Sequence, residues 1–159
     1  MIYVTVGTEG FDPLAEKMDE LVGEGKINEK VVIQTGCGKY IPKNCEHYDI
    51  VPSEKHEEFY KKADLIISHG GAGTIFEVLE KGKKMIGVEN PCVADSHQSD
   101  LLSEFSEKGF LVWCKNLDDL EETIKKIKKI KYKKYQQPEC KIQYKIKEFL
   151  DNLKKQALK

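Results

Sequence analysis

Residues 63–77 read ADLIISHGGAGTIFE, and this stretch decides the fold of the chain. Its apolar run at residues 65–67 is short and contains two β-branched side chains, which is typical of a strand covered on both faces. Three glycines follow almost at once, and from Thr74 onward apolar residues return at helical spacing. The stretch therefore predicts a buried strand, a glycine turn and the first turns of a helix.

The glycine turn also predicts a binding site. Glycine permits positive φ values and has no Cβ to keep a ligand at a distance. Free N–H groups and the dipole at a helix N-terminus favour an anion such as phosphate, and open α/β sheets bind ligands at the carboxyl ends of their strands. Tight packing alone would explain the same glycines. The spacing matches neither the dinucleotide fingerprint nor a Walker loop, because no Gly-Lys-Ser/Thr sequence follows.

Strand and helix patterns alternate at short spacing along the chain. The predicted strands are residues 2–6, 30–35, 47–51, 65–68, 84–88 and 111–113. The predicted helices are residues 13–22, 54–62 and 74–81, one that develops out of the loop at 90–98, and one from residue 117 onward. Asp12 is expected to cap the first helix, with Pro13 at its first position. This alternation predicts an α/β fold with a mostly parallel sheet and right-handed crossovers.

The composition limits the kinds of ligand and compartment. The chain has 159 residues, 26 basic and 27 acidic, and every basic residue is a lysine. This balance does not suggest binding to nucleic acid, and without arginine a diphosphate must be held by backbone N–H groups, hydroxyls, His, Gln or Lys. Five cysteines without regular spacing favour reduced thiols over disulfides or a metal site. No apolar run approaches ~20 residues and the first residues already form a strand, so we expect neither a signal peptide nor a membrane span.

The C-terminal tail differs from the rest. Residues 125–134 form a lysine-rich run, and after Pro138 the apolar residues recur at amphipathic helical spacing. We expect one domain over residues 1–135 and an amphipathic helix within 136–159. That helix could pack on its own domain, cover a partner subunit or lie near an anionic membrane surface.

A set of short motifs, taken in order, resembles a known family. The motifs are VTVGT at 4–8, Phe11-Asp12, IQTG at 33–36, the 63–77 stretch, Gly82-Lys83, Asn90-Pro91 and His97-Gln98. Over about residues 1 to 115 the chain is similar to the C-terminal, donor-binding half of family 28 glycosyltransferases of the GT-B type. Taken together, the motifs resemble the small donor-binding subunits of two-part UDP-N-acetylglucosamine transferases.

This resemblance implies a fold and an activity. The fold would be one Rossmann-like half of a GT-B enzyme, a parallel sheet flanked by helices. The chain would bind UDP-GlcNAc and transfer GlcNAc, with inversion and without a metal or other cofactor, to a lipid-diphosphate-linked sugar. A membrane-anchored partner subunit would bind that acceptor. The chain would then be cytoplasmic and peripheral at the cytosolic membrane face through its partner.

The resemblance also implies site residues, for each of which an ordinary structural role is the alternative. The implied donor-binding residues are Gly7, Thr8, Ser53, His69, Gly71, Ala72, Gly73, Thr74, Glu77, Asn90, His97 and Gln98. The turn after His69 would hold the diphosphate, Glu77 the ribose hydroxyls, and Gln98 with His97 the sugar or β-phosphate. Ser53 and the two residues before it would lie against uracil. Gly7 and Thr8 would line the cleft that faces the partner.

The catalytic base is not evident from the sequence. His69 and His97 are candidates, Asp95 is another, and a carboxylate of the partner would serve as well. Departing UDP gains negative charge, which helix N–H groups can stabilise. Two other functions stay open: a non-catalytic nucleotide-sugar-binding accessory subunit, and the same chemistry with another UDP-sugar in polysaccharide synthesis.

Overall fold

The computed structural model describes residues 1–93, 97–130 and 132–157. The strands are β1 (Ile2–Thr5), β2 (Val31–Gln34), β3 (Glu46–Tyr48), β4 (Leu65–His69), β5 (Lys84–Val88) and β6 (Val112–Cys114). The α-helices are α1 (Asp12–Gly23), α2 (Ser53–Lys62), α3 (Ala72–Glu80), α4 (Gln98–Glu107), α5 (Leu120–Ile127) and α6 (Ile142–Ala157). A 3-10 helix, η1 (Leu117–Asp119), leads into α5.

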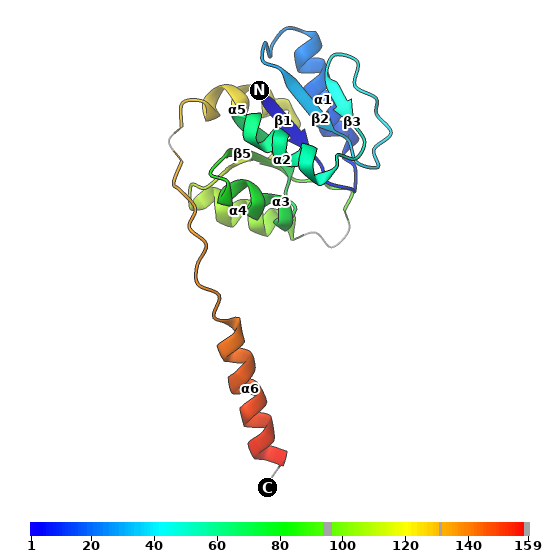
Figure 1. The fold of residues 1–159 in the computed structure, drawn as a ribbon. Coiled ribbons are helices and arrows are strands. Elements are labelled where there is room, and N and C mark those ends of the chain that lie inside the picture. Colours follow the sequence, from blue (N-terminus) through cyan, green and yellow to red (C-terminus); the bar gives the residue numbers. More distant parts are fainter. Residues whose placement is uncertain (94–96, 131, 158–159) are drawn as a thin grey trace.

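The six strands form one parallel sheet in the order β3-β2-β1-β4-β5-β6. From β1 the chain builds outward to β2 and β3, and it then returns to place β4 on the other side of β1 (Figure 1). In this register Val4 lies opposite both Ile33 and Ile67. The predicted fold class, a Rossmann-like parallel sheet flanked by helices, is confirmed.

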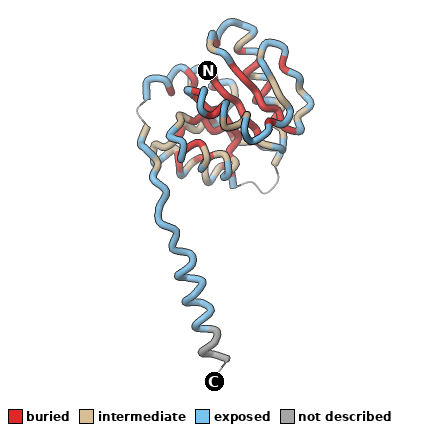
Figure 2. The backbone as a smooth tube through the Cα atoms, viewed as in Figure 1, coloured by how far each residue is buried: buried red, intermediate tan, exposed pale blue. Residues whose placement is uncertain are grey.

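Helices cover both faces of the sheet, and each face has its own apolar cluster. On one face α1 and α5 pack against the strands through buried residues such as Leu14, Met18 and Ile124. On the other face α2, α3 and α4 contribute Phe59, Ile75 and Leu102. Because both faces are covered, the central strands β1 and β4 are buried throughout (Figure 2). This explains why they are nearly continuous apolar runs in the sequence.

The ends of several elements differ from the sequence prediction. The third strand stops at Tyr48 instead of residue 51, and α3 begins at Ala72, two residues earlier than predicted. The prediction that Asp12 caps α1 was wrong, because the capping residue is Phe11 and no side chain caps this helix. The Asp12 carboxylate instead accepts hydrogen bonds from the backbone N–H groups of Lys39 (2.9 and 3.0 Å) and Tyr40 (3.2 Å).

A second carboxylate, that of the buried Asp19 in α1, also holds the loop between β2 and β3. It accepts hydrogen bonds from the Tyr40 hydroxyl (2.9 Å) and from the backbone N–H groups of Lys43 (2.9 Å) and Asn44 (2.7 Å). Burial alone would raise the pKa of Asp19, but these hydrogen bonds outweigh burial and lower it. The ionised carboxylate is therefore part of the fold.

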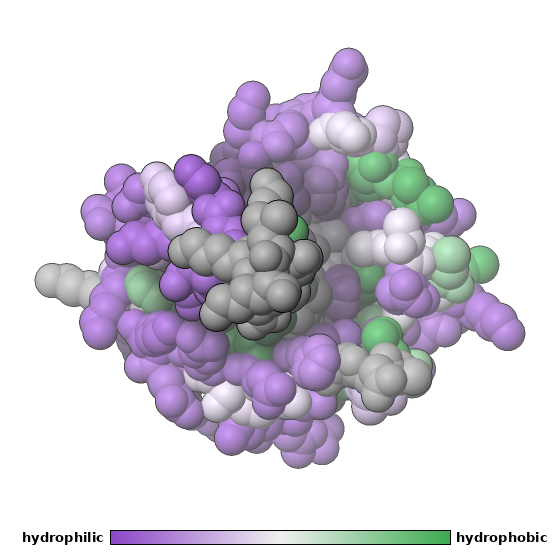
Figure 3. Space-filling view, turned by 90° about the horizontal axis from the view of Figure 1, so that it is seen from below, coloured by the Kyte–Doolittle hydropathy of each residue, from purple (hydrophilic) through white to green (hydrophobic). Residues whose placement is uncertain are grey.

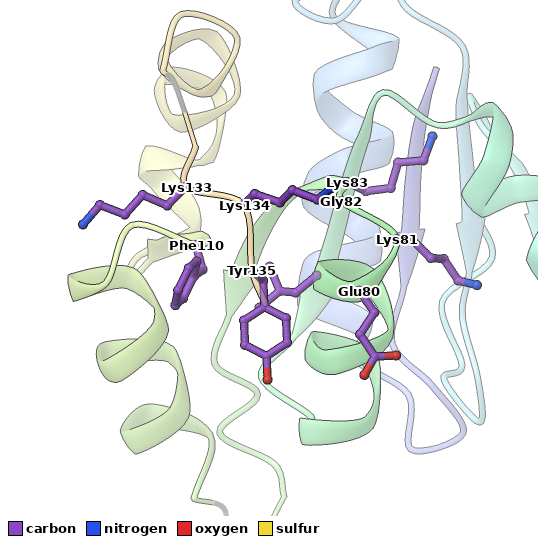
Figure 4. A pocket seen from close by; sticks show the side chains of 9 residues that line it. Glu80, Lys81, Gly82, Lys83, Phe110, Lys133, Lys134 and Tyr135 are labelled. Carbon is purple, nitrogen blue, oxygen red and sulfur yellow. The ribbon is translucent and has the colours of Figure 1, made fainter. Parts of the chain in front are cut away.

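The tail leaves the domain after Tyr135. The Tyr135 ring packs among Phe76, Phe105 and Phe110, with ring centroids 5.4 to 6.2 Å apart. Figure 4 shows it between α3 and α4, beside a pocket of about 490 Å³ that also contains Lys133 and Lys134. This pocket lies where β5 and β6 begin, since Gly82 and Phe110 precede those strands.

Helix α6 does not pack on its own domain, so the first of the three expectations for the tail was wrong. The helix projects away from the sheet (Figure 1), and every side chain from Gln136 to Asn152 is exposed (Figure 2). Within the described residues, no helix is both long and apolar enough to cross a membrane.

The Asp19 network predicts a loss of stability on mutation and in acid. Replacing Asp19 by Ala leaves two backbone N–H groups and a hydroxyl without their acceptor, which is expected to lower the free energy of unfolding by about 3 kcal/mol. Because the folded-state pKa lies below the ordinary value of 3.8, the wild-type contribution is present above that pH and is lost as the pH falls below it. Urea denaturation across a pH series measures both effects.

The neighbouring Glu20→Ala is the matched control, since its carboxylate is exposed and pairs only with Lys17 in the same helix. It is expected to change stability by less than about 1 kcal/mol. Equal losses in the two variants would contradict the role given to Asp19.

Candidate functional site

The candidate site lies at the carboxyl ends of β1, β4 and β5. The sheet order reverses between β1 and β4, so the loops that follow these strands diverge to opposite sides. In open α/β sheets this switch point is where ligands bind. The glycine turn at residues 70–73 follows β4 directly, and it therefore stands at the position that the topology favours for a ligand.

The N-terminus of α3 is open. Gly71 is the capping residue, and none of the side chains that the structure describes hydrogen-bonds to cap the helix. The first intrahelical bond runs from the Ile75 N–H to the Gly71 carbonyl (3.0 Å), so the N–H groups of residues 72–74 precede it. Ala72 and Gly73 are exposed and Thr74 is half-buried. This end of the helix offers three N–H donors and a hydroxyl to an anion, without an acidic residue in the first turn.

The glycines act through their lack of a side chain. At Gly71 φ is −67°, so this residue does not use the positive φ that glycine permits; positive values occur in the adjoining loops, at Gly7 (63°) and Gly36 (62°). A Cβ on Gly71 would lie 2.6 Å from Nε2 of His69, whereas a Cβ on Gly73 would meet no atom within 4 Å. Gly71 thus makes room for the histidine, and Gly73 leaves space that a ligand can occupy.

His69, the last residue of β4, lies between the loop after β1 and the start of α3. Its ring approaches both Gly7 and Gly71 so closely that a Cβ on Gly7 would be 3.3 Å from Cε1. The side chain is buried, and Nδ1 is 3.5 Å from the Ser68 hydroxyl. Burial lowers the pKa of His69, although a hydrogen bond with the Thr5 backbone opposes this. At neutral pH the ring is uncharged, so one of its two nitrogens is a donor and the other an acceptor.

The loop after β1 is held from two sides. The Gly7 carbonyl accepts from Nε2 of Gln34 (3.2 Å), and the Thr8 carbonyl accepts from the N–H of Cys37 (3.0 Å). The Gly10 carbonyl accepts from Nδ2 of Asn90, which lies in the loop after β5 (3.0 Å). Gly7 and Thr8 are therefore presented on a fixed loop, with Thr8 exposed.

Asn90 and Gln98 form a buried link beneath the site. The Asn90 side chain is fully buried, donates to Gly10 and accepts from the N–H of Cys92 (3.1 Å). Oε1 of Gln98 accepts from the Asn90 N–H (2.9 Å), which leaves its amide nitrogen as the end that can donate to a ligand. The Asn90 side chain thus supports the site from below. Gln98, the first residue of α4, lies next to the glycine turn, since a Cβ on Gly70 would be 2.8 Å from the Cβ of Gln98.

Glu77 lies on the side of α3 that faces α2. It is half-buried, 4.0 Å from Nζ of Lys81, and close enough to Tyr60 to raise that residue's pKa in addition to the effect of burial. His56 of α2 hydrogen-bonds the Tyr3 hydroxyl (2.7 Å), and burial lowers the pKa of His56 while Glu77 opposes this. Ser53 is exposed in the first turn of α2. Glu77 and Ser53 thus belong to two helices on the same face of the sheet.

The structure does not gather all of the predicted residues. The His97 side chain is 88% exposed, and its Nδ1 lies 3.6 Å from a carboxylate oxygen of Asp100. Asp95, the further candidate for the catalytic base, lies outside the described residues. Among the residues that the structure does describe, no group of three or more His, Cys, Asp or Glu side chains is arranged to hold a metal ion.

Sequence reasoning missed the supporting residues Gln34 and His56. Gln34 lies in the quoted motif at residues 33–36, and a polar residue at the carboxyl end of an otherwise apolar strand was the available signal for it. His56 gave no signal, because its partner Tyr3 lies on another element 53 residues away.

We predict that His69 titrates below the ordinary histidine pKa of 6.5, since burial disfavours the imidazolium form. An NMR pH titration of the folded chain measures this value, with His69→Asn identifying the resonance. In the urea-unfolded chain the same resonance is expected to return to about 6.5. A folded-state pKa at or above 6.5 would contradict the burial of the His69 ring between Gly7 and Gly71.

Comparison with known proteins relates this geometry to a family. The glycosyltransferase family 28 C-terminal domain matches residues 1–156. The human UDP-N-acetylglucosamine transferase subunit ALG13 is 33% identical over 122 residues, which are 71% of this chain and 11% of the human protein. The UDP-N-acetylglucosamine--N-acetylmuramyl-(pentapeptide) pyrophosphoryl-undecaprenol N-acetylglucosamine transferase of Sulfurihydrogenibium sp. is 28% identical over 127 residues, 79% of this chain and 36% of that protein. The chain thus spans a minor part of these curated relatives.

Solved structures agree on the fold. MurG of Acinetobacter baumannii matches with a TM-score of 0.62 and 21% identity, over 80% of this chain and 40% of that one. The NMR solution structure of ALG13 matches with a TM-score of 0.58 and 20% identity, over 84% and 87% of the two chains. The fold is one Rossmann-like half of a GT-B enzyme, and the chain belongs to the glycosyltransferase family 28 C-terminal domain family.

Proposed function

We propose that this chain is the donor-binding subunit of an inverting glycosyltransferase that takes N-acetylglucosamine from UDP-GlcNAc. The observation that carries the proposal is the open N-terminus of α3 at the switch point of the sheet, with His69 directly beneath it. The relatives named as UDP-N-acetylglucosamine transferases support the choice of donor.

The α3 terminus suits the leaving group of such a reaction. As the bond between the anomeric carbon and the β-phosphate oxygen breaks, negative charge develops on UDP. The N–H groups of Ala72, Gly73 and Thr74 are already oriented, so they stabilise this charge without rearrangement. Uncharged His69 adds one further donor if Nε2, the nitrogen beside Gly71, carries the proton. This arrangement can supply the stabilisation that a metal provides elsewhere, and metal independence is part of the proposal.

The acceptor half belongs to a second polypeptide in this proposal. The match covers 40% of the MurG chain. A GT-B active site lies between two such halves, so in a single half the carboxyl ends of the strands, where the donor would bind, face solvent. We propose that a membrane-anchored partner subunit supplies the acceptor side and binds a lipid-diphosphate-linked sugar. The partner would also supply the catalytic base, because in this proposal His69, which lies against Gly71, contacts the phosphates and His97 is exposed to solvent. The chain would then act at the cytosolic membrane face.

The first test is isothermal titration of the purified chain with UDP, UDP-GlcNAc, UDP-galactose and UDP-glucuronic acid, without metal and then with Mg²⁺. We expect binding without metal and a preference for UDP-GlcNAc. A preference for another UDP-sugar would keep the donor site and change the substrate. Absence of binding to all four would contradict a donor site preformed in this chain.

Glu77→Gln tests the ribose assignment. This substitution keeps the shape of the side chain but removes the charged acceptor, so the affinity for UDP is expected to fall about tenfold. Glu80→Gln is the matched control, because Glu80 lies on the same helix but lines the pocket at the other edge of the sheet. If Glu77→Gln binds UDP as the wild type does, the ribose assignment is wrong.

Two alanine substitutions separate packing from ligand approach. Gly73→Ala adds a methyl group in open space, so stability is expected to be unchanged while UDP affinity falls by about tenfold, since the backbone can no longer be approached closely. Gly71→Ala drives a Cβ against His69 and is expected to lower both stability, by about 1 to 3 kcal/mol, and affinity. Thermal unfolding and UDP titration of both variants give the comparison. Unchanged affinity in Gly73→Ala would remove the α3 terminus from the site.

A further inference from the structure

We propose that the tail after α5 binds an anionic lipid surface directly, with the apolar side of α6 inserted among the headgroups. The inference concerns a different part of the chain from the donor site. It is therefore independent of the proposed function, and it adds a membrane contact that needs no partner subunit.

The first observation is the separation of charge along the chain. Residues 128–159 contain 11 lysines and three acidic residues, whereas the 127 residues before them contain 15 lysines and 24 acidic residues. The whole chain is nearly neutral at −1, but its domain is acidic and its tail is basic. An anionic surface would repel the domain and attract the tail, and each lysine near such a surface adds to the attraction.

The second observation is the apolar side of α6, which has no cover in the structure. Ile142, Ile146, Phe149 and Leu150 are between 49% and 63% exposed. At 3.6 residues per turn they fall within an arc of about 100°. Figure 3 shows that the surface on the side from which the tail emerges is mostly hydrophilic, with several apolar patches between the hydrophilic residues.

The third observation is the placement of charge around that arc. Lys145 lies beyond one border of the apolar arc and Lys147 beyond the other, whereas Glu148 and Asp151 lie on the opposite side of the helix. Lysines at both borders can extend to phosphate groups while their alkyl stems stay in the apolar layer. The acidic residues then face water, away from the lipid. This pattern is the one expected of a helix lying in the plane of a membrane interface.

The segment before α6 supports the same arrangement. Tyr135 anchors the chain on the domain, and Lys133 and Lys134 beside it are exposed, with side chains that point away from the Tyr135 ring in Figure 4. These lysines lie at the root of the tail. Lysines therefore stand both at the root of the tail and along α6.

The test is flotation of the full chain with vesicles of phosphatidylcholine alone and with an equal mixture of phosphatidylcholine and phosphatidylserine. We expect binding to the mixed vesicles, weakened by salt, and much weaker binding to phosphatidylcholine. Ile146→Asp is expected to reduce binding at least about tenfold, since an apolar contact is lost. Lys145→Gln combined with Lys147→Gln is expected to reduce it about 25-fold, at roughly fivefold for each lysine.

Asp151→Asn is the matched control on the opposite side of α6, and it should bind as well as the wild type or better. Titration of UDP into Ile146→Asp should give the wild-type affinity, so failure of donor binding and failure of lipid binding are distinguishable. Absence of binding to the mixed vesicles would overturn the proposal. If the chain instead self-associates in sedimentation velocity and Ile146→Asp abolishes the self-association, the apolar side of α6 packs against a second copy of the chain. If the chain does not self-associate, the apolar side is available to a different protein.

Discussion

The structure depends on the divergence of the chain between β1 and β4. Two neighbouring parallel strands whose following loops turn to opposite sides leave a gap above the sheet, and no side chain in the described part of the chain caps the helix that begins there. The α3 terminus is available to a ligand for this reason. The two residues that support it, His69 and Asn90, are both buried, so the open end rests on a rigid base.

The local parts of this arrangement could be predicted from the sequence, and the long-range parts could not. The strand at 84–88 and the strand, turn and helix at 63–77 follow from short patterns of apolar residues and glycine. The roles of Asp12 and Gln34 depend on partners 27 residues away, and no local pattern reports such a contact. Gly71 is required for the space that it leaves and not for a positive φ, because the His69 ring lies where a Cβ would be, and no local pattern reports that contact.

The amphipathic pattern of α6 was correctly identified, but its position was not. An apolar stripe favours the burial of one side of a helix in a contact, but it does not identify the surface on the other side of that contact. The decisive information is the position of lysines at both borders of the stripe. Fold and site thus follow from the apolar residues, whereas the role of the tail follows from charge.

The anchoring of Tyr135 has a geometric consequence. The ring holds the root of the tail at the edge where β5 and β6 begin, and the glycine turn stands at the edge where the strands end. Residues 136–141 are neither helix nor strand, and six residues span at most about 20 Å. If α6 is held at a surface, residues 136–141 tether the domain by the edge of the sheet that lies opposite the glycine turn. The domain can then move within about 20 Å of that attachment point, with the glycine turn directed away from it.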